Sequence, residues 1–272
     1  MSRMLRAILY SAVLGVFACA LPSQAQQLDC MFTYTSAPPK PSMTFCVSPN
    51  GNLTNLQIPI GSNGLVAEGL IGYSGLLEGS EGYGVCQESP VASYFDYINN
   101  AGEDATTWMA ATVVSQTTTS IKIARTTADG NWTLTQTFTA QETNPPAVQV
   151  TMALHNNTTV AHVVYLVRVV GTTYHYDYNS SSTQSNAFAW GNSSPVDNFG
   201  LGFLMSNVGT PQFGFMNSYV WQAEWLSNPC NFAGNAATAP TNQGQGIMSI
   251  AYVDTIGAKK TKTATIRYTT LD

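Results

Sequence analysis

The sequence predicts an all-β protein, built as a large antiparallel β-sandwich of two packed sheets with little helix. Many short segments alternate apolar and polar residues with a period of two, which is the pattern of half-buried strands. Gly, Pro and Asn separate these segments, and no segment shows a sustained helical period with capping residues. Charged residues make up only 9% of the chain, and Thr and aromatic residues are abundant, a composition that suits strands.

The N-terminus has the pattern of a secretory signal peptide. Arg3 and Arg6 precede a mostly apolar run, residues 7–21, and Ser23-Gln24-Ala25 supplies the small-x-small motif that a signal peptidase reads. The run is shorter than the about 20 residues of a membrane span. We therefore expect a signal peptide over residues 1–25 and a single β-sandwich domain over residues 26–272, secreted, periplasmic or at the cell surface of a bacterium. The alternative is a lipobox that ends at Cys19 and carries a lipid anchor there.

Loss of Arg3 and Arg6 with the signal leaves eight basic against 15 acidic residues, a formal charge of −7. This balance argues against a nucleic-acid partner and against attachment to anionic lipid, since both require a basic surface. No phosphate-binding loop and no closely spaced zinc or calcium motif is present, so no metal or other cofactor is expected.

Four cysteines remain in the mature chain: Cys30, Cys46, Cys86 and Cys230. An even number in an exported chain indicates two disulfide bonds, for which three pairings exist. We favour Cys30–Cys46 with Cys86–Cys230, because the residues that follow Cys30 and precede Cys46 have the pattern of neighbouring strands joined at Pro38-Pro39.

The next segments are less regular. Residues 61–86 are rich in glycine and carry Glu68, Glu78 and Glu81, followed by Glu88. Paired carboxylates there could serve glycoside chemistry, but solvated loop carboxylates are the preferred interpretation. Residues 89–100 are the one place where a helical turn or two is expected.

The clearest local signal is a hairpin between residues 120–125 and 132–138, which alternate strictly around the turn Asp129-Gly130-Asn131. One face of the second strand should be buried and the other should face water. The buried face is expected to carry Trp132, Leu134, Gln136 and Phe138, and the wet face Thr133, Thr135 and Thr137.

Further strands are expected along the rest of the chain. Asn144-Pro145-Pro146 breaks the chain before residues 148–154, which alternate again. Residues 160–170 are apolar and β-branched, so they should be a central strand, and with the two preceding strands they predict an antiparallel meander. The later strands are expected at residues 200–205, 212–219, 248–253 and 261–268.

Residues 121–177 resemble secreted bacterial sandwich proteins with the β-supersandwich of galactose-mutarotase-like domains, most of them uncharacterised. The similar stretches are residues 123–130, 132–138, 150–158 and 164–168. The resemblance implies the order of the strands. It implies no chemistry, and no catalytic residue of that family is carried over to this sequence.

Two motifs contain candidate ligand-binding residues. In Tyr174-His175-Tyr176-Asp177-Tyr178, an extended strand places His175 and Asp177 on one side, where they could act as acid and base, with Arg168 as a third member. In residues 221–225, Trp221 and Trp225 could stack on sugar rings while Glu224 binds hydroxyl groups. Alternatively, the His–Asp pair is a structural hydrogen bond and the tryptophans belong to the core.

The preferred functional hypothesis is an exported non-catalytic module that binds a glycan or another cell-surface partner. The first alternative is a carbohydrate-active enzyme, a glycoside hydrolase, lyase or epimerase, that uses Glu224 or the His175–Asp177 pair. The second is a structural envelope protein without a ligand.

Overall fold

The computed structural model describes residues 30–60, 65–71, 81–99, 102–104, 106–170, 176–182, 187–193, 202–221, 228–230, 242–243 and 247–271. Within these ranges the chain forms strands and turns, with no α-helix. The strands make three sheets, of nine, six and four strands, and their pairings are antiparallel. The predicted all-β sandwich with little helix is therefore confirmed.

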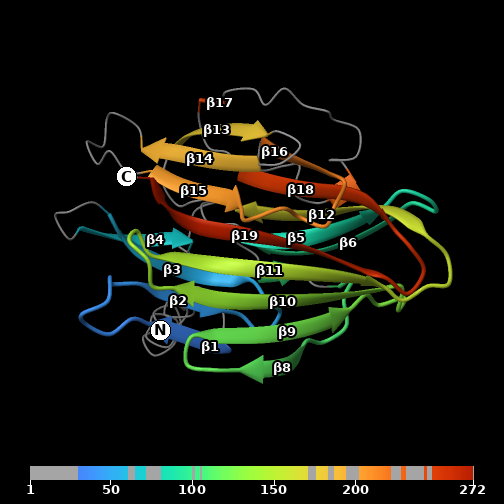
Figure 1. Cartoon of the computed structure of the whole chain (residues 1–272), viewed down its shortest axis with the longest axis horizontal. Helices are drawn as coiled ribbons and strands as arrows, with labels where there is room; N and C mark the ends of the chain where they lie inside the picture. The colour runs from blue at the N-terminus through green and yellow to red at the C-terminus, as the bar shows by residue number, and fades with distance from the viewer. Residues whose placement is uncertain are drawn as a thin grey trace, which may run out of the picture.

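The nine-stranded sheet runs across the front of the molecule, from β8 at the bottom to β17 at the top (Figure 1). Its strands, in spatial order, are β17 (Asn242–Gln243), β13 (Tyr176–Ser182), β14 (Ala187–Ser193), β15 (Gly202–Asn207), β19 (Thr261–Leu271), β11 (Ala147–Asn156), β10 (Trp132–Gln141), β9 (Ser120–Thr126) and β8 (Thr112–Gln116).

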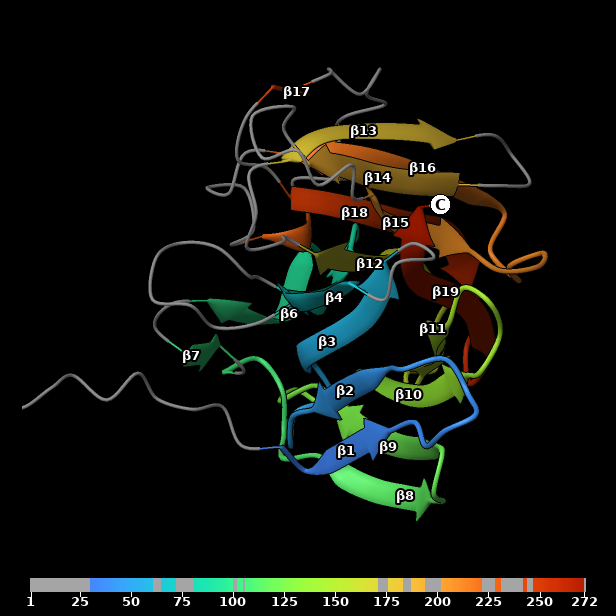
Figure 2. The ribbon, with the colours of Figure 1, turned by 90° about the vertical axis from the view of Figure 1, so that its left-hand side faces the viewer.

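The two smaller sheets are made of the remaining strands. The six-stranded sheet has the order β16 (Phe215–Trp221), β18 (Ile247–Ile256), β12 (His162–Val170), β5 (Glu81–Gln87), β6 (Ala92–Asn99) and β7 (Gly102–Asp104). The four-stranded sheet has the order β1 (Phe32–Thr35), β2 (Thr44–Val47), β3 (Leu53–Ile60) and β4 (Leu65–Ile71). Figure 2 shows β1 and β2 beside the end of the nine-stranded sheet that contains β8, β9 and β10.

Both smaller sheets lie on the same face of the nine-stranded sheet. The side chain of Gln136 in β10 bonds to the backbone oxygen of Gly51, between β2 and β3, and also to Arg168 in β12. One layer of the sandwich is therefore the nine-stranded sheet, and the other layer is formed by the six- and four-stranded sheets. A single apolar core unites all three sheets, with Phe45, Val150 and Leu166 among its fully buried members.

The hairpin formed by β9 and β10 is confirmed. In β10, buried and partly exposed residues alternate over the whole strand, and Trp132, Leu134, Gln136 and Phe138 are on the buried face as predicted. Gly130 has a φ of +77° in the connecting turn, a conformation that glycine adopts without steric cost.

The predicted meander is wrong in its third strand. β11 is followed by β12, but β12 lies in the six-stranded sheet between β18 and β5, while β11 pairs with β10 and β19. The Asn156 amide donates to the backbone oxygens of Val160 and Ile256 and so fixes the point where the chain crosses between layers. The central position predicted for this strand is correct, and its last five residues are all buried, as expected for a continuous apolar run.

Two other predictions from the sequence need correction. Residues 92–99, where a helical turn was expected, form strand β6, which pairs with β5 and β7. Glu81, interpreted as a solvated loop carboxylate, begins β5 and is completely buried. Glu88 is exposed, Glu68 lies in β4, and Glu78 is outside the described residues.

Disulfide bonds join Cys30 to Cys46 and Cys86 to Cys230, which is the pairing favoured above. Two disulfides indicate folding in an oxidising compartment. In the part of the chain that the structure describes, no helix is long and apolar enough to cross a membrane. The proposed signal peptide and the alternative lipid anchor at Cys19 fall outside the described residues.

Candidate functional site

The candidate residues from the sequence are only partly described. His175, Glu224 and Trp225 lie outside the described residues. Asp177 is the second residue of β13, and Trp221 is the last residue of β16.

The strands that contain Asp177 and Trp221 lie close together. β13 belongs to the nine-stranded sheet and β16 is an edge strand of the six-stranded sheet, yet the two strands lie beside one another (Figures 1 and 2). Asp177 pairs through its backbone with Asn192 in β14, and Trp221 pairs with Ile247 in β18. The strand that contains Asp177 and the strand that ends at Trp221 therefore meet where the two layers come together.

Arg168 lies in the interior of the sandwich. Its side chain is completely buried, and its Nε donates to Glu81 Oε1 at 2.6 Å and lies 3.1 Å from the Tyr268 hydroxyl. Its Nη1 donates to Gln136 Oε1. The guanidinium also lies 5.2 Å from the centre of the Phe138 ring, a cation–π contact. The Arg168 side chain is therefore bonded to side chains of β5, β19 and β10 in the interior.

A second buried ion pair lies nearby in the same interior. Arg125 in β9 bonds to Asp96 in β6, and Arg125 Nη1 is 2.6 Å from the Tyr83 hydroxyl. Asp96 also accepts a hydrogen bond of 2.9 Å from the Asn52 amide. The Arg125–Asp96 pair therefore joins the nine-stranded sheet to the six-stranded sheet. Arg168 and Glu81 both belong to the six-stranded sheet, and Arg168 reaches the nine-stranded sheet through Gln136 and Tyr268.

The turn between β2 and β3 connects the two ion pairs. The Leu53 backbone N–H donates to Glu81 Oε2 at 2.8 Å, and the Asn50 carbonyl accepts a hydrogen bond from Tyr83 at 2.8 Å. Gly51 lies between them with a φ of +87° and its carbonyl accepts from Gln136. The turn inserts backbone donors and acceptors into the interior, and these satisfy the buried polar side chains.

Electrostatics agree with a closed structural network. Burial raises the pKa of the Glu81 carboxyl, and this effect exceeds the lowering by the Arg168 charge. Burial alone would lower the pKa of Arg168, but the neighbouring Glu81 and Tyr268 raise it above its ordinary value. Burial also raises the pKa of Tyr83. Burial therefore disfavours the charge of each residue, and the partner's charge favours it.

The outer face of the six-stranded sheet is the second notable surface. Gly82 and Gly84 of β5 lie between the stacked rings of Phe95 and Tyr97 in β6 and the buried valines of β12, with ring centroids 5.4 Å apart. A Cβ at Gly84 would meet Pro229 and the Tyr97 hydroxyl, both at 2.8 Å. The glycines therefore let Pro229 and the Tyr97 ring approach the sheet backbone.

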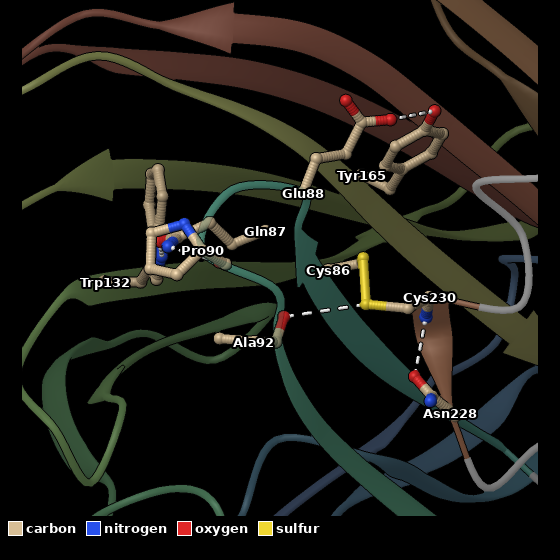
Figure 3. The surroundings of a disulfide bond; sticks show 9 residues. All are labelled: Cys86, Gln87, Glu88, Pro90, Ala92, Trp132, Tyr165, Asn228 and Cys230. Carbon is tan, nitrogen blue, oxygen red and sulfur yellow. Dashed lines mark hydrogen bonds between the residues drawn. A yellow bond between two sulfur atoms is a disulfide. The ribbon is translucent and has the colours of Figure 1, made fainter.

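The Cys86–Cys230 disulfide fastens residues 228–230 to this face (Figure 3). The Cys230 backbone N–H donates to the Asn228 side chain at 2.8 Å, and Cys230 Sγ contacts the Ala92 carbonyl at 3.6 Å. Near the same end of β5, the Tyr165 hydroxyl donates to exposed Glu88 at 2.8 Å. Trp221 pairs with β18 and Cys230 is bonded to β5, so the chain is attached to the six-stranded sheet at both of these residues.

The close contact between β5 and β6 gives a test of this packing. A Cβ at Gly82 would lie 2.2 Å from the Asp96 carbonyl oxygen and 2.8 Å from Tyr97 Cα. Because both are backbone atoms, we expect Gly82→Ala to lower the free energy of unfolding by about 1–3 kcal/mol, measured by urea denaturation. Gly257→Ala is the control, since its Cβ would meet only the flexible Lys260 side chain at 3.4 Å. Equal stability of the two variants would contradict the close packing at Gly82.

No protein-family model matches the chain, and no curated protein matches its sequence. Its fold is similar to that of solved structures. A polysaccharide lyase is similar with a TM-score of 0.51 and 9% identity, over 86% of this chain and 33% of the lyase chain. This chain therefore spans about a third of the lyase, and the likeness is one of fold.

Two further structures are similar over most of this chain. A protein described as an aldose 1-epimerase from Escherichia coli K12 has a TM-score of 0.43 and 10% identity, over 88% of this chain and 99% of that one. A protein described as a kojibiose phosphorylase from the human microbiome has a TM-score of 0.41 and 7% identity, over 90% of this chain and 30% of that one. An aldose 1-epimerase is thus among the similar structures.

Proposed function

We propose that this chain is an exported, non-catalytic β-sandwich module that binds a glycan where β13 and β16 meet. In this proposal residues 1–25 are removed and residues 26–272 form one domain. The neutral polar composition supports it, since the hydroxyl groups of sugars are bound by uncharged side chains as well as by carboxylates. The shared fold with a polysaccharide lyase supports a carbohydrate ligand as the first class to test.

The observation that carries the proposal is the proximity of β13 and β16. β13 contains Asp177 and β16 ends at Trp221, so one residue of each candidate motif lies on these strands, although more than 30 residues separate the strands in the chain. Trp221 and Trp225 supply apolar ring faces for stacking, and Glu224, His175 and Asp177 supply hydrogen-bonding groups.

We expect Trp221→Ala and Trp225→Ala each to weaken glycan binding at least about tenfold, since stacking on a sugar ring requires the aromatic plane. A glycan array identifies the ligand, and calorimetric titration measures the affinity. Trp221→Phe is the conservative control and should retain most of the affinity. Val160→Ala, at an exposed site, should change nothing.

The enzyme hypothesis predicts a different result for Glu224→Gln. In a glycoside hydrolase or lyase that uses Glu224 as acid or base, this substitution would abolish the formation of product and leave glycan binding intact. In a binding module, the wild type releases no reducing ends or unsaturated products from any glycan that it binds. Detection of such turnover in the wild type would overturn the non-catalytic proposal, and absence of all glycan binding would overturn the glycan proposal.

A further inference from the structure

The outer face of strands β9, β10, β11 and β19 presents hydroxyl groups. These strands lie side by side in the nine-stranded sheet, and their outer face is the one opposite the two smaller sheets (Figure 1). On this face β10 has four partly exposed threonines, from Thr133 to Thr139, and β19 has three, from Thr261 to Thr265. A threonine hydroxyl both donates and accepts hydrogen bonds, so this face can bind a ligand that is rich in hydroxyl groups.

Charge is distributed unevenly between this part of the sheet and the rest of the chain. The six adjacent strands β15, β19, β11, β10, β9 and β8 contain no Asp or Glu, although the full chain has 15. Lys122 in β9 and Arg267 in β19 are positive side chains on the outer face. An anionic group can therefore approach this face without meeting a carboxylate of these strands, although the chain as a whole is acidic.

Both cations are available to a ligand. Neither Lys122 nor Arg267 forms an ion pair with another residue in the described part of the chain. Arg267 Nη2 makes only long contacts, at 3.4 Å to Thr143 Oγ1 and to the Pro145 carbonyl oxygen, and its Nε is buried without a hydrogen-bond partner. A guanidinium group has five N–H donors in a fork that matches a carboxylate, so the described residues leave Arg267 with donors for one.

The register of the strands sets the order of these groups across the sheet. Lys122, Thr137, Thr151 and Thr265 form one row over the four strands, and Arg267 is two residues beyond Thr265 on the same face. β9 and β19 are three positions apart in the sheet, which is about 14 Å at the usual spacing of strands. Two separated positive charges with hydroxyl groups between them match a polymer that carries spaced carboxylates and many hydroxyl groups.

We propose that the outer face of β9, β10, β11 and β19 binds an acidic polysaccharide, a polymer that contains uronic acids. Carboxylates of the polymer bind Lys122 and Arg267, and its hydroxyl groups bind the threonines between them. This site is separate from the one proposed where β13 and β16 meet, and it does not depend on that proposal.

The same features argue against other anionic partners. Duplex DNA carries one negative charge per about 1.7 Å and is bound by proteins that neutralise many phosphates. Two unpaired cations on an acidic chain do not meet that requirement, and an anionic lipid surface likewise requires clustered positive charge. The outward positions of β9, β10, β11 and β19 hold no Trp, Tyr or Phe, so binding here depends on charge and hydrogen bonds instead of stacking.

The test is calorimetric titration of the mature chain with polygalacturonate, alginate and hyaluronate at low ionic strength. Wild type should bind at least one of the three, and should bind the same polymer at least about tenfold more weakly after methyl esterification of its carboxylates. The double variant Lys122→Gln/Arg267→Gln should also bind at least about tenfold more weakly and should lose most of the salt dependence shown by the wild type. Thr137→Val removes one hydroxyl and keeps a β-branched side chain, so it should weaken binding about threefold.

Lys259→Gln/Lys260→Gln is the matched control, because it removes the same charge from two exposed lysines in the turn between β18 and β19. This control should bind like the wild type, and an equal loss of affinity would show that general attraction, and not this face, holds the polymer. Absence of binding to all three polymers, or equal binding of the esterified polymer or of duplex DNA, would also overturn the proposal. A polymer that loses affinity in Trp221→Ala but not in the Lys122/Arg267 variant is bound where β13 and β16 meet. That result would reject the present site and leave the glycan proposal standing.

Discussion

Replacing Arg168 by methionine should lower the free energy of unfolding by about 3–5 kcal/mol at pH 7, which is the loss expected when one partner of a buried ion pair is removed. Both side chains of the Arg168–Glu81 pair are completely buried. Methionine fills much of the arginine volume, so the effect comes mainly from Glu81, which is left as an unpaired carboxylate. Urea denaturation of the purified variant measures this loss.

The loss should depend on pH in a defined direction. The Arg168 charge lowers the pKa of Glu81 and so opposes the effect of burial. Without Arg168, the pKa of Glu81 in the folded state should therefore rise further. A carboxyl group whose pKa is higher in the folded than in the unfolded state lowers the free energy of unfolding as pH rises above the unfolded pKa. This loss disappears as pH falls toward the unfolded value near 4.3. Arg168→Met should therefore differ less from the wild type at pH 4.5 than at pH 7.

Two further variants separate this account from a simple packing defect. Adding Glu81→Gln to Arg168→Met should recover part of the lost stability at pH 7, because the unpaired charge is removed. Lys40→Met breaks the exposed pair with Glu142 and should cost less than about 1 kcal/mol. If the double variant is less stable than Arg168→Met at pH 7, the buried charge is not the cause of the loss.

The parts of the fold that depend on local pattern could be predicted from the sequence. Strict alternation identified β10 and placed Gln136 on its buried face together with Trp132 and Phe138. A glutamine on an apolar face indicates a buried polar partner. The partner, Arg168, is 32 residues away in the chain, and nothing local identified it.

Long-range features could not be predicted in the same way. Glu81 begins the strand Glu81–Gln87, in which two glycines hide the alternation that places Glu81, Tyr83 and Val85 on one face. The crossing of β12 into the other layer depends on its pairing with β18, which is about 80 residues away. For the candidate site, the sequence identified residue types, and only the fold shows that β13 and β16 lie side by side.

The turn between β2 and β3 shows why burial of charge is possible here. Its backbone groups reach Glu81, Tyr83 and Gln136, so buried side chains from two sheets find partners in a third. Polar contacts of this kind depend on orientation, unlike apolar packing. The network therefore fixes how the four-stranded sheet is placed relative to the other two.

The two disulfides should contribute unequally to stability. The Cys86–Cys230 bond closes a loop of 144 residues, and the Cys30–Cys46 bond closes one of 16. If a disulfide acts by restricting the unfolded chain, the longer loop contributes about 5 kcal/mol and the shorter about 3 kcal/mol. The double serine variant at 86 and 230 should therefore be less stable than the one at 30 and 46, by about 2 kcal/mol, in urea denaturation without reductant.

The same pair of variants also tests the binding proposal, because only one disulfide holds the segment that follows Trp221. Cys230 anchors the end of that segment to β5, whereas Cys30 and Cys46 lie in the four-stranded sheet. We expect loss of the Cys86–Cys230 bond to weaken glycan binding under conditions where the variant is still folded, since an anchored segment loses less conformational entropy on binding. Loss of the Cys30–Cys46 bond should leave the affinity unchanged. Equal affinities in both folded variants would show that the anchor has no part in binding.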